Sequence, residues 1–114
     1  MASPEITLEA VSSASLIAAA DWDACANSRG PDNGISVVAN YNPFISHAFF
    51  NAVEQSNSAC ARTGWAPRHL VAKVDGKVAG LVPCYLKSHS QGEYVFDRGW
   101  ADAYERAGGR YYPK

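Results

Sequence analysis

The chain has 114 residues and a mass of 12.2 kDa, which allows one domain. Its hydrophobic content of 47% excludes a disordered protein, and its 10 basic and 11 acidic residues are too scattered for a DNA-binding surface. No apolar run approaches the roughly 20 residues that span a bilayer, and the first residues lack the pattern of a secretory signal. We therefore expect a cytoplasmic protein with no transmembrane segment.

The first part of the chain predicts a strand followed by a helix. Residues 5–11 alternate weakly between apolar and polar side chains, as a strand does. Ser12 and Ser13 are good N-cap residues, and residues 14–27 keep helical spacing with Trp22 as a large packing anchor. Residues 28–34 are rich in glycine and proline and predict a loop. Residues 35–39 are either a short strand or an extended connector.

A second helix is expected after the break at Asn40 to Pro43. Either Asn42 caps it with Pro43 at its first position, or Ser46 caps a helix that starts at His47; we favour Ser46. The helix is expected to end near Asn57. Helical spacing predicts a buried stripe made of Phe49, Ala52, Val53 and Ser56.

The strongest local signal is Asp75-Gly76, a dipeptide typical of two-residue hairpin turns. Apolar runs at 70–74 and 78–86 flank it. Uninterrupted pairing from this turn places three pairs opposite each other: Val74 and Lys77, Ala72 and Ala79, and Leu70 and Leu81. Both faces of the hairpin are mainly apolar, so we expect other parts of the chain to cover each of them. Pro83 has no N–H to donate, so pairing is expected to stop or bulge there.

The last part of the chain predicts a short helix at 99–107, with Asp97 as its N-cap and Gly108-Gly109 at its end. Residues 110–114 begin another strand, so we expect residues 1–114 to be a single domain from the N-terminal part of a longer protein. The element order predicts an α+β fold, an antiparallel β-sheet with a central hairpin at about 67–87 covered by two helices. The absence of a GxGxxG motif argues against a dinucleotide-binding fold.

Cysteines and histidines are dispersed along the chain. Without a CxxC motif or a secretory signal, the three cysteines are predicted to be reduced core residues: Cys25, Cys60 and Cys84. The spacing of the three histidines suggests no metal site: His47, His69 and His89.

Three segments carry a resemblance to a known family: NPFISHAFFNAVEQS, TGWAPRHLVAKVDGKVAGLVPCYLKSHSQGEYVFD and WADAYERAGGRYYPK. Together they resemble the N-terminal part of a bacterial family of acyltransferase-like proteins. That family is called FemAB-like, is associated with peptidoglycan biosynthesis, and belongs to the wider GNAT (Gcn5-related N-acetyltransferase) superfamily. The resemblance covers about residues 20–114. It implies a partial GNAT-like fold, which begins with a strand, two helices and an antiparallel hairpin.

The resemblance also implies an activity, the transfer of an acyl or aminoacyl group to an amine acceptor in cell-wall metabolism. The full-length donor would be acyl-CoA or an aminoacyl-tRNA, and the acceptor a small molecule or a cell-wall precursor. In the superfamily, the donor's pyrophosphate binds at a helix N-terminus that would lie beyond Lys114. The 114-residue chain alone is therefore expected to bind no cofactor and to be inactive.

The residues that follow Pro83 supply the side chains for such chemistry, which needs a base, oxyanion donors and an acid. His89 and Glu93 are the candidate catalytic bases. The candidate substrate-binding residues are Tyr85 or Tyr94 as the acid, Lys87 as a charge for an anion, and Ser88 and Ser90 as hydroxyl donors.

Each of these residues also has a structural interpretation. A histidine in a serine-rich loop is often only a hydrogen-bonding residue, the serines form turns, and the charged side chains are solvated. Five other aromatic residues have the character to line a pocket, although core packing is favoured for most: Trp65, Trp100, Tyr104, Tyr111 and Tyr112.

Three functions follow from these observations. The first is the N-terminal portion of an N-acyltransferase. The second is a non-catalytic half-domain that forms a homo-oligomer, or completes a partner's fold, through unpaired sheet edges. The third is a small module whose loop at 87–94 binds an anion without chemistry. Native molecular mass separates the second from the first, and binding without turnover indicates the third.

Overall fold

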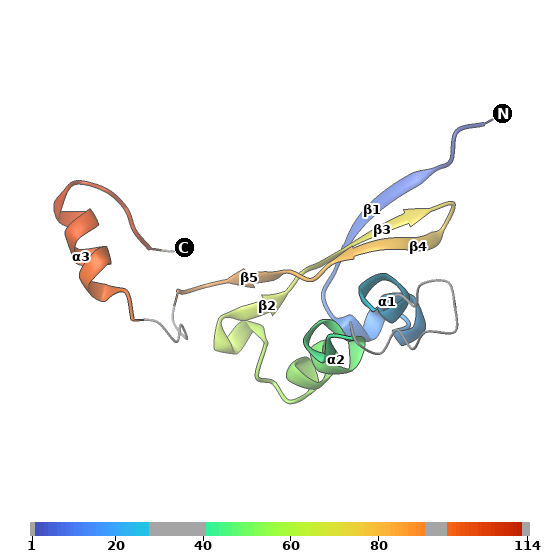
Figure 1. Cartoon of the computed structure of the whole chain (residues 1–114), viewed down its shortest axis with the longest axis horizontal. Helices are drawn as coiled ribbons and strands as arrows, with labels where there is room; N and C mark the ends of the chain where they lie inside the picture. Colours follow the sequence, from blue (N-terminus) through green and yellow to red (C-terminus); the bar gives the residue numbers. More distant parts are fainter. Residues whose placement is uncertain (1, 28–40, 91–95, 113–114) are drawn as a thin grey trace.

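The fold is built around a three-stranded antiparallel sheet, seen in a computed structural model that describes residues 2–27, 41–90 and 96–112. The strand order is β1 (Ile6–Val11), β3 (His69–Val74), β4 (Lys77–Val82). A two-stranded antiparallel ribbon, β2 (Trp65–Pro67) with β5 (Tyr85–Lys87), continues from the hairpin. Helices α1 (Ala19–Ala26) and α2 (His47–Gln55) lie on the same side of the sheet (Figure 1), and α3 (Arg98–Arg106) follows the ribbon. The predicted α+β fold is confirmed.

The hairpin turn is as predicted, but the strand register is not. Asp75 and Gly76 both have positive φ, as a two-residue turn of this kind requires, and Val74 pairs with Lys77. A β-bulge then follows, because Lys73 pairs with Val78 whereas Ala72 pairs with Gly80. Ala79 is the extra residue, so the predicted pairs of Ala72 with Ala79 and of Leu70 with Leu81 are wrong by one position.

The bulge brings two apolar side chains of β4 to the same face of the sheet. Leu81 is three positions after Val78, an odd offset, so strict alternation would place the two side chains on opposite faces of the sheet. With the bulge, both side chains pack against the buried residues on the helix side, next to Val71. The bulge therefore adds one more apolar side chain to the core than a regular strand would.

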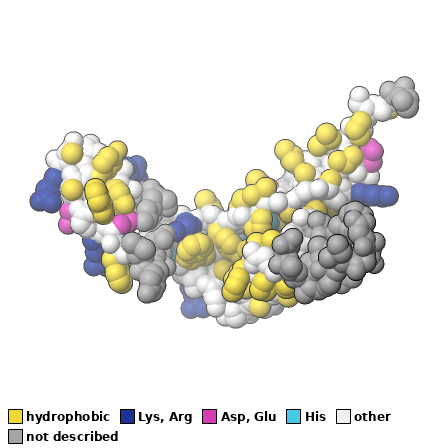
Figure 2. Space-filling model, in the orientation of Figure 1, with side chains coloured by type: hydrophobic (Ala, Val, Ile, Leu, Met, Phe, Trp, Pro, Cys, Tyr) yellow, Lys and Arg dark blue, Asp and Glu magenta, His cyan; other side chains and the backbone are white. Residues whose placement is uncertain are grey.

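Only one face of the sheet is covered by the described residues. Apolar side chains on the opposite face stay exposed, including Leu8 at 79% and Val82 at 55%. Figure 2 shows hydrophobic side chains along the strands on the side away from the helices. The expectation that both faces are covered is wrong in this structure, and self-association through the sheet edges stays a prediction.

The predicted helix at 14–27 is broken in two. A short 3-10 turn, η1 (Ala14–Leu16), is capped by Ser13, and α1 begins only at Ala19. Ile17 and the next residue have extended backbone, which lets Ile17 and Trp22 both enter the core. The predicted anchor Trp22 is fully buried, and its Nε1–H donates to the Ile45 carbonyl at 3.0 Å.

Helix α2 starts where it was predicted to start. Ser46 is its N-cap, and its hydroxyl oxygen accepts from the Phe49 N–H. Asn42 also caps, but it caps the 3-10 turn η3 (Pro43–Ile45), in which Pro43 is the first residue. The carboxylate of Asp23 accepts the His47 N–H and so joins α1 to the first turn of α2.

The buried face of α2 differs from the predicted stripe. Phe49 and Ala52 are exposed, and Phe50 packs on the core instead. The reason is that the buried face of α2 includes polar residues, and a prediction based on the spacing of apolar residues cannot identify them. His47 and Glu54 both turn inward from α2, and their side chains bond to Ala14.

The centre of the fold is a buried network around Glu54 and His69. Glu54 accepts the Ala14 N–H at 2.8 Å through one carboxylate oxygen, and the other lies 2.9 Å from Nε2 of His69. On the far side of the ring, Nδ1 of His69 accepts the Cys84 N–H at 3.1 Å. Because Nδ1 accepts, the hydrogen-bond network assigns the proton to Nε2, and the ring is a neutral donor to the carboxylate.

The region after the ribbon differs from the predicted strand. Residues 110–112 are neither helix nor strand. Asp97 stands at the N-cap position of α3, but its carboxylate accepts the hydroxyls of Tyr111 at 3.0 Å and Tyr112 at 2.6 Å. Trp100 and Tyr104 are exposed, so the core packing favoured for most of the five aromatic residues does not hold for these two.

We predict that Glu54→Ala lowers the free energy of unfolding by about 3 kcal/mol, because two buried donors, on His69 and Ala14, lose their acceptor. Glu9→Ala is the matched control. Glu9 pairs with Lys73 at 2.7 Å on a more exposed surface, and its loss costs at most about 1 kcal/mol. Urea denaturation followed by circular dichroism measures both. Equal, small losses would show that the Glu54 network is not central to stability.

Candidate functional site

The β2–β5 ribbon brings the predicted site residues next to a segment far away in the sequence. Trp65 pairs with Lys87 and Pro67 with Tyr85. Backbone bonds extend this pairing on both sides, from Ser88 N–H to the Gly64 carbonyl and from Arg68 N–H to the Cys84 carbonyl. Strand β4 ends just before Pro83, as predicted, and pairing resumes with a new partner at Tyr85.

Lys87 is held by an aromatic ring. Its ammonium lies 4.3 Å from the centroid of the Trp65 ring, a cation–π contact between directly paired residues of the ribbon. The side chain is half-buried. The contact fixes the position of the Lys87 charge, which was expected to bind an anion. Lys87 is therefore not the freely solvated side chain of the alternative structural interpretation.

His89 lies against the turn that precedes β2. Its Nε2 is 2.9 Å from the Thr63 carbonyl, so Nε2 donates and carries a proton. Gly64 has a φ of 84°, and a Cβ at this position would lie 2.3 Å from Nε2 of His89 and 2.8 Å from Oγ of Ser88. The absence of a side chain at Gly64 therefore lets the imidazole and the Ser88 hydroxyl approach the backbone.

Tyr85 lies at the other end of the ribbon, where it meets the buried network. Its ring is edge-on to His69 at 5.4 Å and to Trp65 at 5.9 Å between centroids. Burial raises the pKa of the phenol to about 12, and the charge of Glu54 adds to this effect. Tyr85 therefore keeps its proton well above neutral pH and acts as a hydrogen-bond donor.

The predicted residues do not form one compact cluster. Lys87, Ser88 and His89 gather around 63–65, whereas Tyr85 lies toward His69. Ser90 is half-buried. Glu93, Tyr94 and the predicted loop at 28–34 lie outside the residues that the structure describes.

Sequence reasoning missed the contribution of Thr63 and Gly64. One signal for this turn is present in the sequence, since a glycine just after a helical turn commonly has the left-handed backbone that Gly64 adopts. The segment 60–63 is itself held together, since the Cys60 N–H donates to the Thr63 hydroxyl. Hydrogen bonding to the backbone and side chain of Thr63 lowers the pKa of the Cys60 thiol.

The cysteines are free, as predicted, but their burial is not uniform. Cys25 is exposed, which contradicts its predicted place in the core, and Cys60 and Cys84 are half-buried. Within the described ranges, no group of three His, Cys, Asp or Glu side chains is arranged to hold a metal ion. None of the described helices has the length and apolar content required to cross a bilayer.

The chain belongs to the FemAB-like family, whose model, described as peptidoglycan biosynthesis/recognition, matches residues 13–114. This match begins after β1 and covers the other two strands of the sheet, both core helices, the ribbon and α3. Comparison with curated proteins gave no significant match. Comparison with solved structures also gave none.

We predict that Gly64→Ala lowers the free energy of unfolding by about 1–2 kcal/mol more than Gly76→Ala. Both glycines have left-handed backbone, with φ of 84° and 79°, so both substitutions pay the same backbone cost. Only Gly64 meets other side chains, since nothing lies within 4 Å of a Cβ at Gly76. Thermal unfolding measures the difference. Adding His89→Ala to Gly64→Ala should recover much of it, and identical losses for the two glycines would contradict the close packing of His89.

Proposed function

We propose that this chain forms part of an N-acyltransferase that transfers an acyl or aminoacyl group to an amine of a cell-wall precursor. The observation that carries the proposal is the family match over residues 13–114. The element order supports it, because a strand, two helices and an antiparallel hairpin are also the beginning of the GNAT fold that the resemblance implies. Placement in that superfamily, with acyl-CoA or aminoacyl-tRNA as donor, is part of the proposal.

In this proposal, His89 is the base that removes a proton from the acceptor ammonium. Its Nε2 donates to the Thr63 carbonyl, so Nδ1 is the basic nitrogen of the neutral ring. The contact with Thr63 also orients the ring, as the base in a catalytic pair needs. Lys87, held over Trp65, supplies a positive charge one residue before Ser88 and two residues before His89.

Tyr85 suits a different role from the acid considered for it. A general acid works best when its pKa is near the working pH, and the Tyr85 pKa of about 12 is far above neutrality. A phenol that keeps its proton is instead suited to donate a hydrogen bond to a developing oxyanion. We therefore leave the acid role to Tyr94 and assign Tyr85, which lies toward His69 and not beside His89, to hydrogen bonding with the bound substrate.

The assay incubates the full-length protein that contains this chain with acetyl-CoA or an aminoacyl-tRNA and an amine-bearing peptidoglycan precursor, and mass spectrometry detects the modified acceptor. His89→Ala and Glu93→Ala are each expected to lower turnover more than about tenfold, as loss of a general base does.

His89→Gln separates catalysis from structure. The Gln amide can donate to the Thr63 carbonyl as Nε2 does, but it is not a base. We expect this variant to fold like the wild type and to remain as slow as His89→Ala. Full turnover by His89→Gln would assign His89 a structural role only. Absence of transfer by the full-length wild type with both donor classes would overturn the proposed function.

A further inference from the structure

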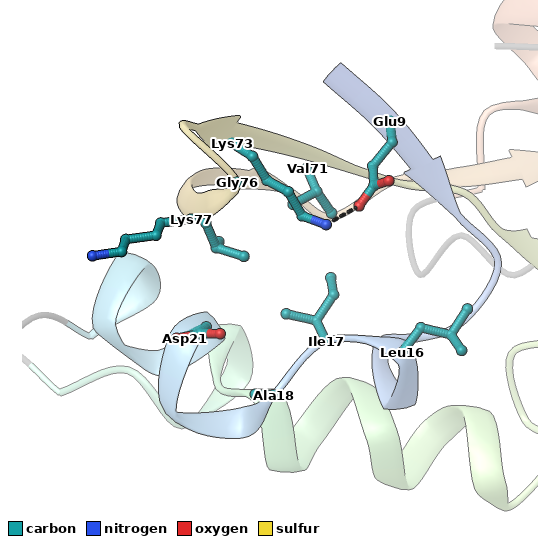
Figure 3. A pocket seen from close by; sticks show the side chains of 10 residues that line it. Glu9, Leu16, Ile17, Ala18, Asp21, Val71, Lys73, Gly76 and Lys77 are labelled. Atoms are coloured by element: carbon teal, nitrogen blue, oxygen red, sulfur yellow. Dashed lines mark ion pairs between the residues drawn. The ribbon is translucent and has the colours of Figure 1, made fainter. Parts of the chain in front are cut away.

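A cavity of about 460 Å³ lies on the helix side of the sheet, away from the ribbon. Figure 3 shows it between the β3–β4 hairpin, β1 and the segment that joins η1 to α1. Its apolar lining comes from Ile17, Val71 and Val78, of which the first two are buried in the core. Gly76 at the hairpin turn adds no side chain, which keeps that end of the cavity open.

The polar lining is balanced in charge. On one wall, the Lys73 ammonium is 2.7 Å from the Glu9 carboxylate, and the two charges neutralise each other. The remaining charges are Asp21 on α1 and Lys77 on β4, which lie at the same end of the cavity on its helix wall and its hairpin wall, with the Lys77 side chain extended outward at the rim (Figure 3). In the part of the chain that the structure describes, neither Asp21 nor Lys77 has an ion-pair partner.

This arrangement restricts the class of ligand. A polyanion such as a nucleotide would find only one unpaired ammonium, Lys77, and would also face the unpaired carboxylate of Asp21. A purely apolar ligand would leave both unpaired charges on the rim without a partner, although it would fill the apolar lining. A molecule with one ammonium, one carboxylate and an aliphatic body matches the Asp21 carboxylate, the Lys77 ammonium and the apolar lining of the cavity.

The volume of the cavity limits the size of the ligand. Because one water occupies about 30 Å³ in the liquid, the cavity corresponds to roughly 15 non-hydrogen atoms, the size of a dipeptide with small aliphatic side chains. We propose that this cavity binds a short aliphatic zwitterion, a dipeptide whose ammonium meets Asp21 and whose carboxylate meets Lys77. The site shares no residue with the ribbon and does not depend on acyl transfer.

The test uses L-valyl-L-valine as the probe and follows the backbone amide signals of the full chain by NMR. We expect saturable binding that shifts signals of residues 16–21 and 76–78. Asp21→Asn and Lys77→Gln should each weaken binding about tenfold, as the loss of one charge-assisted hydrogen bond does. Both residues are exposed, so these variants keep the fold. Asp102→Asn, an exposed position on α3, is the matched control and should bind like the wild type.

A blocked probe, N-acetyl-L-valyl-L-valine amide, has the same aliphatic body without the two charges. We expect the affinity for this blocked probe to be lower than that for the free dipeptide by at least about tenfold. Equal affinity for the blocked and free dipeptides would overturn the proposal, as would unchanged affinity in both charge variants or no saturable binding by the wild type. Inorganic phosphate that competes with the dipeptide at Lys77 and binds more tightly would also overturn it, in favour of an anion site.

Discussion

The hydrogen bonds between Glu54 and its two donors are the constraint on which the rest of the fold depends. A buried carboxylate is costly unless its oxygens are bonded, and here one oxygen accepts from the Ala14 backbone and the other from His69. These contacts join the turn before α1, the last turn of α2 and the first residue of β3. His47 adds a bond to the Ala14 carbonyl, so both backbone groups of Ala14 are held by α2. The two helices are thereby fixed on one side of the sheet.

The same network reaches the candidate site through Cys84. The Cys84 N–H donates to His69, and its carbonyl accepts from Arg68, so the backbone is clamped just after Pro83. This clamp determines where β5 begins and therefore which residues pair across the ribbon. It also places Tyr85 beside the His69 ring. The position of Lys87 and His89 next to 63–65 is a consequence of that register.

Features that depend on neighbouring residues in the chain could be predicted from the sequence. The Asp75-Gly76 turn, the Ser46 cap, the Trp22 anchor and the interruption at Pro83 all follow from local chemistry. Features that depend on buried polar contacts could not. The break before α1 and the rotated face of α2 are set by bonds from Glu54 and His47 to Ala14, and spacing of apolar residues contains no signal for them. For the site, the sequence identified the loop after Pro83 but not its partner at Thr63 and Gly64.

The state of the His69 ring tests this account most directly. A proton–nitrogen correlation NMR spectrum of the histidine rings at neutral pH distinguishes the two neutral tautomers. We expect His69 to carry its proton on Nε2, with Nδ1 unprotonated and coupled to the Cys84 amide across their hydrogen bond. A His69 ring with a proton on Nδ1 would contradict the account, because Cys84 would then have no acceptor and the link from the core to the ribbon would not exist.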